Sequence, residues 1–136
     1  LVFLCAVISS ITTRALMKDP EWRRHDSPQG HEWLHRELDL NEEEAMAIDT
    51  TEPSYRRNRT ELLNEFQEQI EVLRDLIASS DEFTPQVEDA IQELHRIHGE
   101  LQELSIRHYF EMMSLLPPEK QKRLREMAVK ALSRPE

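Results

Sequence analysis

Hydrophobic residues recur at heptad spacing between positions 85 and 116, which predicts a long helix with one packing seam. The first line of this seam is Val87, Leu94, Leu101 and Leu115. His108 occupies the one step that is missing from this series. The companion line is Ile91, His98, Ser105 and Met112. Two such lines are typical of a helix that packs against an antiparallel partner, so this seam is expected to carry two histidines and a methionine.

The partner of this helix is expected over 42–79, where Phe66 and Leu73 share one heptad phase. Two heptads before Phe66, the same phase reaches Glu52. Pro53 follows directly and would remove a backbone hydrogen bond from a continuous helix. We therefore expect an interruption at this point, with Glu52 at a kink or a helix start. A carboxylate and an imidazole thus stand where leucines are expected.

Shorter elements flank this pair of helices. HEWLHREL at 31–38 has the composition of a short helix, and SSDEFTP at 79–85 supplies the turn between the two long ones. Pro117 and Pro118 stop the second long helix and start a last helix over 118–133, which has one apolar face. The pattern predicts an all-α fold built on a long antiparallel helical hairpin.

Composition agrees with this fold class and limits the possible partners. The chain has 136 residues, enough for one domain, and its two glycines are few for a sheet protein with tight turns. Seventeen basic and 27 acidic residues give a net charge of −10. Such an acidic surface repels the phosphate backbone of nucleic acids and attracts cations. We therefore expect no binding to nucleic acid.

The opening LVFLCAVISSITTRAL has no charged residue before Arg14. We interpret residues 1–17 as a membrane anchor or signal segment, 18–30 as a linker and 31–136 as the folded domain. Cys5 is the only cysteine, so the domain has neither a disulfide nor a thiolate metal ligand. Export through the opening segment would place the domain outside the cytoplasm.

HEWLH at 31–35 matches the H-E-x-x-H pattern of zinc proteases, in which two histidines hold zinc and the glutamate acts as base. Leu38 and Asn41 stand where the longer protease pattern has glycine and histidine. Neither a nucleophile paired with a base nor a phosphate-binding loop can be found. We therefore expect that the protein is not an enzyme, and we interpret His31 and His35 as metal ligands on a short helix.

A hairpin brings together residues that are equally far from its turn. With the turn centred near residue 82, Glu52 lies 30 residues before it and Met112 lies 30 residues after it. His108 is one helical turn nearer, and the helix of the HEWLH motif connects to the same end. The sequence therefore predicts one metal site formed by His31, His35, Glu52, His108 and Met112.

Three imidazoles, one carboxylate and one thioether suit nickel or cobalt at five or six coordination, with zinc as a competing ion. A hard magnesium or calcium site would not use three histidines. His98 is ten residues from His108, or about 15 Å along a helix, so it cannot bind the same ion. For His95 and His98, the surface, the seam or a weaker second site remains open. Glu43 or Glu44 is an alternative ligand if Glu52 turns away at the break.

The chain resembles the CnrX-type periplasmic nickel and cobalt sensors. The resemblance rests on HEWLH, on Glu52 seventeen residues after His35, and on RHYFEM at 107–112. It extends from the HEWLH motif to the C-terminus and includes FTPQVEDAIQEL and LLPPEK. LLPPEK is also similar to the helix junction of the CpxP/Spy-like periplasmic helical-hairpin proteins.

This resemblance implies a fold, a location and a ligand set. The fold would be a hooked four-helix protomer that forms a homodimer in the periplasm and is anchored to the inner membrane. The nitrogen and oxygen ligands would be His31, His35, Glu52 and His108. Met112 would be the thioether ligand that helps to separate nickel and cobalt from zinc.

The resemblance also implies a function. Metal binding would be relayed to a membrane-bound anti-sigma factor and would free a sigma factor to transcribe efflux genes. Two other functions remain open. One is a CpxP/Spy-like periplasmic chaperone or stress adaptor, which would bind unfolded protein without a specific metal. The other is a metal-buffering protein, which would bind several ions and need no protein partner.

Overall fold

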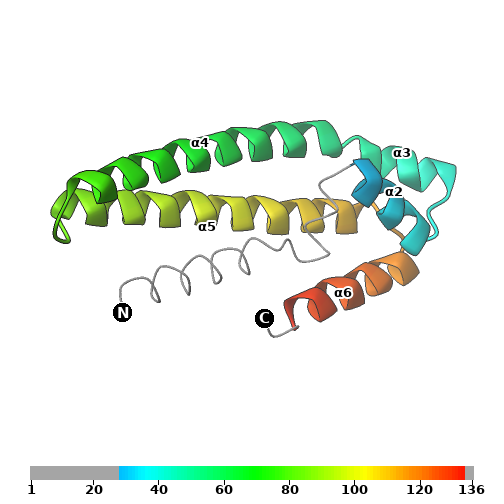
Figure 1. Ribbon diagram of the computed structural model, residues 1–136. Helices are drawn as coiled ribbons and strands as arrows, with labels where there is room; N and C mark the ends of the chain where they lie inside the picture. The colour runs from blue at the N-terminus through cyan, green and yellow to red at the C-terminus, as the bar shows by residue number, and fades with distance from the viewer. Residues whose placement is uncertain (1–27, 134–136) are drawn as a thin grey trace. The chain divides into compact units, whose positions relative to one another are not determined.

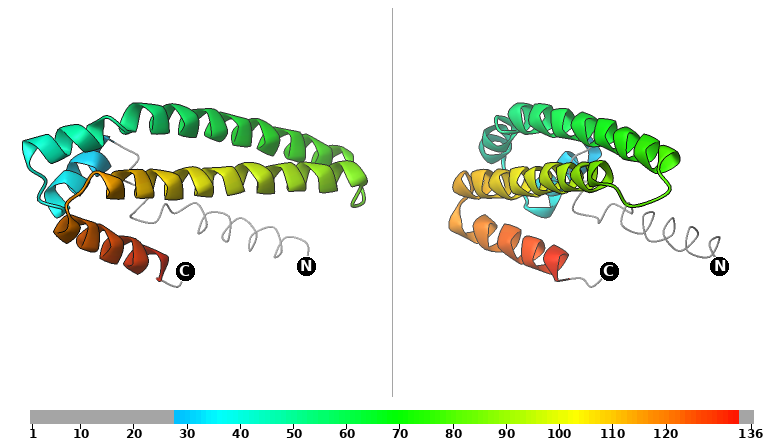
Figure 2. Two further views of the ribbon diagram at one scale, coloured as in Figure 1. Left: turned by 180° about the vertical axis from the view of Figure 1, so that it is seen from behind. Right: turned by 90° about the vertical axis from the view of Figure 1, so that its left-hand side faces the viewer.

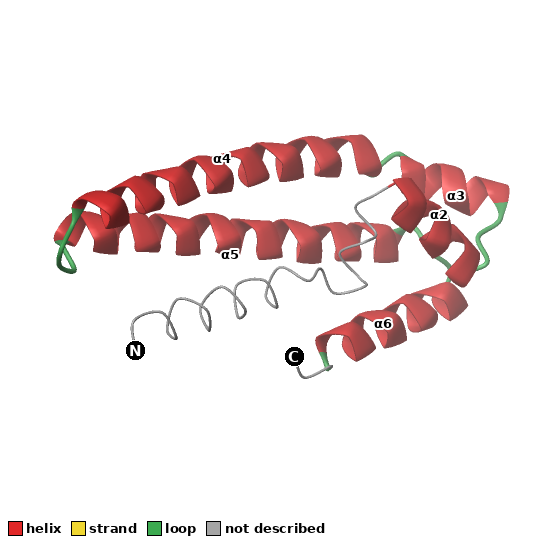
Figure 3. Cartoon of the chain, viewed as in Figure 1, coloured by secondary structure: helices red, strands yellow, loops and turns green. Residues whose placement is uncertain are grey.

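The computed structural model describes residues 28–133. These residues form five α-helices, coloured from blue to red in Figure 1: α2 (Pro28–Glu37), α3 (Glu42–Asp49), α4 (Glu52–Ser79), α5 (Pro85–Ser114) and α6 (Pro118–Leu132). No strand occurs in the described part of the chain, so the predicted all-α class is confirmed (Figure 3). The expected membrane or signal segment, 1–17, lies outside the described residues.

The helices belong to two compact units. The long unit is Glu42–Leu116 and contains α3, α4 and α5. The short unit contains α2 and α6, and its described residues are 28–41 and 117–133. Across residues 28–133, no helix is both long enough and apolar enough to span a bilayer.

In the long unit, α4 and α5 run antiparallel and lie side by side along most of their length (Figures 1 and 2). They are joined by residues 80–84. The apolar residues that α5 buries along its first half are Val87, Ala90, Leu94 and Ile97. Because every buried apolar side chain removes surface from water, this line stabilises the pair.

This buried line corrects one part of the predicted seam. His98 is exposed, and Ile97 takes its place with no exposed surface. Ile91 is only half-buried, whereas Ala90 is buried. The second line of the seam therefore lies three residues after the first, not four. The physical reason is that burial of an unpaired imidazole costs free energy, whereas burial of an isoleucine contributes it.

The break before α4 lies where the proline predicted it. The Thr51 hydroxyl donates to the carbonyl of Ile48 at 2.8 Å, and the Thr51 backbone N–H donates to the same carbonyl at 3.0 Å. α4 then starts at Glu52, with Pro53 as its second residue. A proline is tolerated there because the first-turn N–H groups have no partner within the helix. The expectation that Glu52 lies at a helix start is confirmed.

The start of α5 is fixed by a side-chain cap. The Thr84 hydroxyl oxygen accepts a hydrogen bond from the Val87 backbone N–H at 3.3 Å, and Pro85 is the first residue of the helix. This arrangement satisfies one N–H that the helix itself leaves without a partner, and the fixed φ of proline suits the first turn. The predicted position of the turn is thereby confirmed.

An ion cluster on the surface also joins α4 to α5. The Arg96 guanidinium donates to Glu93 at 2.7 Å and to Glu100 at 2.6 Å, both on α5, and it pairs with Glu65 on α4. The hydrogen bond from Arg96 lowers the pKa of Glu93. The same carboxylates, Glu93 first, raise the pKa of Arg96. Both shifts favour the charged forms of Arg96 and Glu93, and the cluster links the two helices near the middle of the pair.

In the short unit, α2 begins at Pro28, three residues before the predicted domain boundary. Residues 28–30, interpreted from the sequence as the end of the linker, are therefore helical. Proline favours this start because its φ is already close to the helical value. The helix thus begins before the HEWLH motif, and His31 and His35 lie one turn apart on it.

The end of α2 is closed by a Schellman motif. Asp39 has a φ of 51°, and its backbone N–H donates to the Arg36 carbonyl at 3.2 Å. The Leu40 N–H donates to the His35 carbonyl at 3.1 Å, which completes the motif. The Lys120 ammonium of α6 donates to the Asp39 carbonyl at 2.5 Å. α2 is thus connected to α6 within the short unit.

Candidate metal centre

Glu52 and His108 meet in the long unit, although 56 residues separate them in the sequence. Glu52 is the first residue of α4, and His108 lies in the last two turns of α5. Glu52 Oε1 is 3.0 Å from His108 Nε2. Only 12% of the glutamate side chain and 9% of the histidine side chain are exposed. Counting from the turn therefore predicted correctly that these two residues meet.

The imidazole of His108 is held in one orientation by Tyr55. The two rings stack with their centroids 4.0 Å apart and an interplanar angle of 7°. Tyr55 is itself buried, and its hydroxyl lies 3.5 Å from Ser105 Oγ. Stacking of this kind restricts rotation of the imidazole and keeps Nε2 directed at Glu52.

The contact determines which ring nitrogen carries the proton. An ionised carboxylate only accepts hydrogen bonds, so His108 Nε2–H donates to Glu52. On the other side of the ring, His108 Nδ1 is buried and has no hydrogen-bond partner. The nearest carboxylate oxygen there, Glu111 Oε2, is 3.8 Å away. A metal ion at Nε2 would replace the proton that this nitrogen carries.

The second oxygen of Glu52 also accepts a hydrogen bond. The Arg56 Nε–H donates to Glu52 Oε2 at 3.1 Å, from one helical turn further along α4. The carboxylate therefore has a different donor on each oxygen, which fixes its plane.

The spacing of this pair fits a transition metal. Two ligand atoms about 2.1 Å from one ion and at right angles to each other lie about 3.0 Å apart. The observed separation of Glu52 Oε1 and His108 Nε2 is 3.0 Å. Imidazole with carboxylate suits nickel, cobalt and zinc. Glu52 Oε1 and His108 Nε2 thus have the spacing of two adjacent ligands of one ion. Among residues 28–133, no group of three or more His, Cys, Asp or Glu side chains is arranged to hold an ion.

The other three predicted ligands are placed as follows. Met112 is half-buried on α5, one helical turn after His108, and so lies on the same side of the helix. His31 and His35 lie on α2 in the short unit, where His35 is half-buried. The structure therefore brings together Glu52 and His108, with Met112 on the same helix as His108. The meeting of all five ligands stays a prediction.

Sequence reasoning missed two residues of the site, Tyr55 and Arg56. For Arg56, a signal was available, because a glutamate and an arginine four residues apart on a helix commonly pair. Tyr55 could be found only once α4 was paired with α5, because its ring stacks on a residue of the other helix. His95 and His98, by contrast, are exposed on α5.

Comparison with known proteins places the chain in one family. Residues 1–123 match the heavy-metal resistance family. The chain is also 32% identical over 104 residues to the nickel and cobalt resistance protein CnrR of Cupriavidus metallidurans. That alignment covers 76% of this chain and 70% of the relative. The chain therefore belongs to the heavy-metal resistance family, as its resemblance to the CnrX-type proteins predicted.

Proposed function

We propose that the protein is a sensor of nickel or cobalt ions that lies in the periplasm and is anchored to the inner membrane. The observation that carries this proposal is the contact between Glu52 and His108, in which a carboxylate oxygen and an imidazole nitrogen lie 3.0 Å apart in a largely buried setting. A relative whose name refers to nickel and cobalt resistance supports the choice of ions.

The proposed site combines this pair with three further ligands. Met112, one turn after His108, would contribute a thioether, which favours nickel and cobalt over harder ions. His31 and His35 would contribute two imidazoles from one face of α2. A site of five ligands is typical of nickel or cobalt at five or six coordination, and zinc is the ion that would compete.

The proposed signal is a change in how the two units are coupled. Glu52, His108 and Met112 belong to the long unit, whereas His31 and His35 belong to the short one. An ion that binds ligands of both units would favour the arrangement of the units in which all of these ligands reach it. The difference in metal affinity between this arrangement and the others supplies the free energy of the signal. We infer that a homodimer transmits the change to a membrane-bound anti-sigma factor, which then frees a sigma factor.

A transcriptional reporter tests the sensing role. In cells that carry a reporter of metal-efflux transcription, added nickel or cobalt should induce the reporter with the wild-type protein. His108→Ala should abolish induction because it removes a ligand, whereas His98→Ala, which removes an exposed histidine of the same helix, should leave it intact. Induction that persists unchanged in His108→Ala would exclude sensing through this site.

One observation favours a second function, that of a chaperone. An apolar groove lies where α4 and α5 are joined, with Ile77 62% exposed and Phe83 69% exposed. Exposed apolar patches of this kind bind other proteins. A chaperone should suppress the aggregation of an unfolded client protein in the presence of a metal chelator, and Phe83→Ser should weaken this effect. Suppression that requires added metal would argue against the chaperone function.

A further inference from the structure

We propose, on the basis of the sensor function above, that Arg56 sets the metal affinity of the site. In the metal-free protein it holds one oxygen of Glu52 and places a fixed positive charge beside the position where the ion would bind. Arg56 would thereby weaken metal binding and raise the ion concentration at which the sensor responds.

The first step of the argument is the geometry at Glu52. His108 Nε2 lies 3.0 Å from Glu52 Oε1, and Arg56 Nε lies 3.1 Å from Glu52 Oε2. An ion that binds Glu52 through one oxygen displaces the histidine proton and leaves the Arg56 contact in place. An ion that binds through both oxygens must also break the contact with Arg56. Arg56 therefore opposes bidentate binding by this carboxylate.

The second step is electrostatic. The guanidinium of Arg56 carries a positive charge. Its side chain is 40% exposed and that of Glu52 is 12% exposed, so water screens this pair less than it screens an ion pair in open solvent. A unit charge within a few ångströms of a divalent ion changes the affinity by about tenfold, even at a high dielectric constant.

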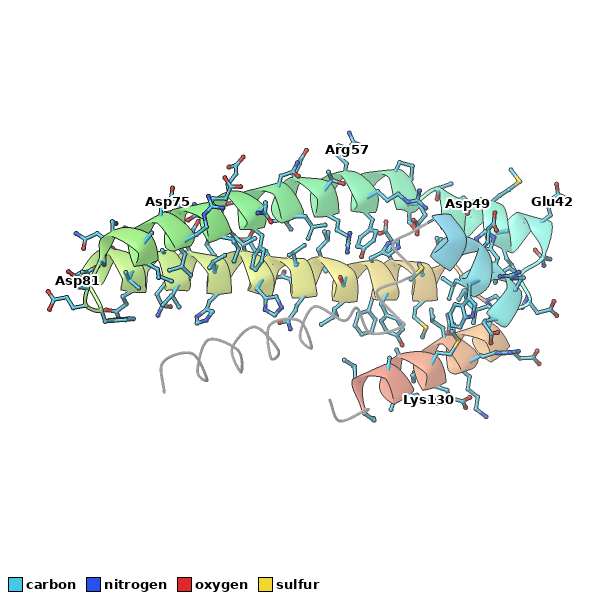
Figure 4. All side chains as sticks on the ribbon, viewed as in Figure 1. Glu42, Asp49, Arg57, Asp75, Asp81 and Lys130 are labelled. Carbon is cyan, nitrogen blue, oxygen red and sulfur yellow. The ribbon has the colours of Figure 1, made fainter. Side chains whose placement is uncertain are left out.

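The chain provides a matched control in the next residue, Arg57. It carries the same charge on the same turn of α4, and it is exposed. Figure 4 shows Arg57 projecting from the side of α4 that faces away from α5. Removal of this charge changes the net charge of the protein as much as removal of Arg56 does, but it leaves the donors to Glu52 unchanged.

The test is a titration of the full chain with Co(II) in competition with a chelator. Arg56→Gln should bind Co(II) about tenfold more tightly than the wild type, and Arg57→Gln should stay within about twofold of it. Arg56→Lys restores the charge and should bring the affinity back toward the wild-type value. A melting curve for each variant checks that the helices remain folded.

Three outcomes separate this inference from the function on which it rests. Equal affinities for Arg56→Gln and Arg57→Gln, or weaker binding by Arg56→Gln, would overturn the role of Arg56. Binding by Arg56→Lys as tight as that of Arg56→Gln would overturn it as well, because the charge would then not be the cause. If the wild-type chain binds no Co(II), the proposed sensor function itself fails.

Discussion

At the scale of single residues, His108 is constrained by neighbours that come from a different helix. Tyr55 stacks on its ring at 4.0 Å, and Glu52 accepts a hydrogen bond from its Nε2–H. Residues that orient a metal-ligating histidine commonly change metal affinity by 10- to 100-fold when they are replaced, because a ring that rotates freely must be ordered on binding. Tyr55 is such a residue for the proposed site.

Replacement of Tyr55 tests this role. Tyr55→Leu should weaken Co(II) binding by about tenfold, because the leucine fills space without stacking on the imidazole. Tyr55→Phe keeps the ring and loses only the hydroxyl near Ser105, so its affinity should stay close to that of the wild type. Titration of both variants with Co(II) gives the comparison. Equal affinities for the leucine and phenylalanine variants would show that stacking does not position His108.

At the scale of helices, α4 and α5 are joined both by a buried apolar line and by the Arg96 cluster on the surface. Because the hydrogen bond from Arg96 lowers the pKa of Glu93, the charged carboxylate is favoured in the folded protein. The pKa of a glutamate in the unfolded chain is about 4.3. Above this pH, the ionised carboxylate contributes to the stability of the fold. The contribution is lost as the pH falls through the lower pKa of the folded protein.

The lowered pKa of Glu93 predicts how the effect of Arg96→Gln on stability depends on pH. The substitution should lower the melting temperature at pH 7, where Glu93 is ionised, and should have a smaller effect at pH 3, where part of the carboxyl groups are protonated. Arg57→Gln, which removes a charge that faces away from α5, should change the melting temperature less at pH 7. If Arg96→Gln has the same effect at both pH values, the cluster does not act through ionised carboxylates.

Much of this helical arrangement could be predicted from local chemistry. Pro53 marked the break before α4, and Thr84 with Pro85 marked the start of α5, because each changes backbone hydrogen bonding in a way that its neighbours cannot offset. The second line of the seam was misplaced at His98. The choice between Ile97 and His98 depends on which side of α5 faces α4, and heptad spacing alone leaves that choice open.

The candidate site was predictable only in part, for a related reason. Equal distance from the turn was enough to pair Glu52 with His108, because two antiparallel helices keep a constant register. The positions of His31 and His35 relative to that pair depend on a short connection whose direction no periodic pattern encodes. The contact of Arg56 with Glu52 required knowledge of the side-chain directions at the first turn of α4.

At the scale of the whole molecule, the proposed ligands are divided between the two compact units. Glu52, His108 and Met112 belong to the long unit, and His31 and His35 to the short unit. The net charge of −10 attracts cations to the protein but does not select among them. Selection must therefore come from the donor set, and our proposal requires donors from both units at one ion.

The most direct test of this proposal is the visible absorption of the full chain during titration with Co(II). We predict that the wild type and His98→Ala saturate at one ion per chain with the same spectrum. His35→Ala and His108→Ala, which each remove a ligand from a different unit, should both lose that spectrum. A wild-type spectrum from either variant would contradict a single site that is shared by the two units.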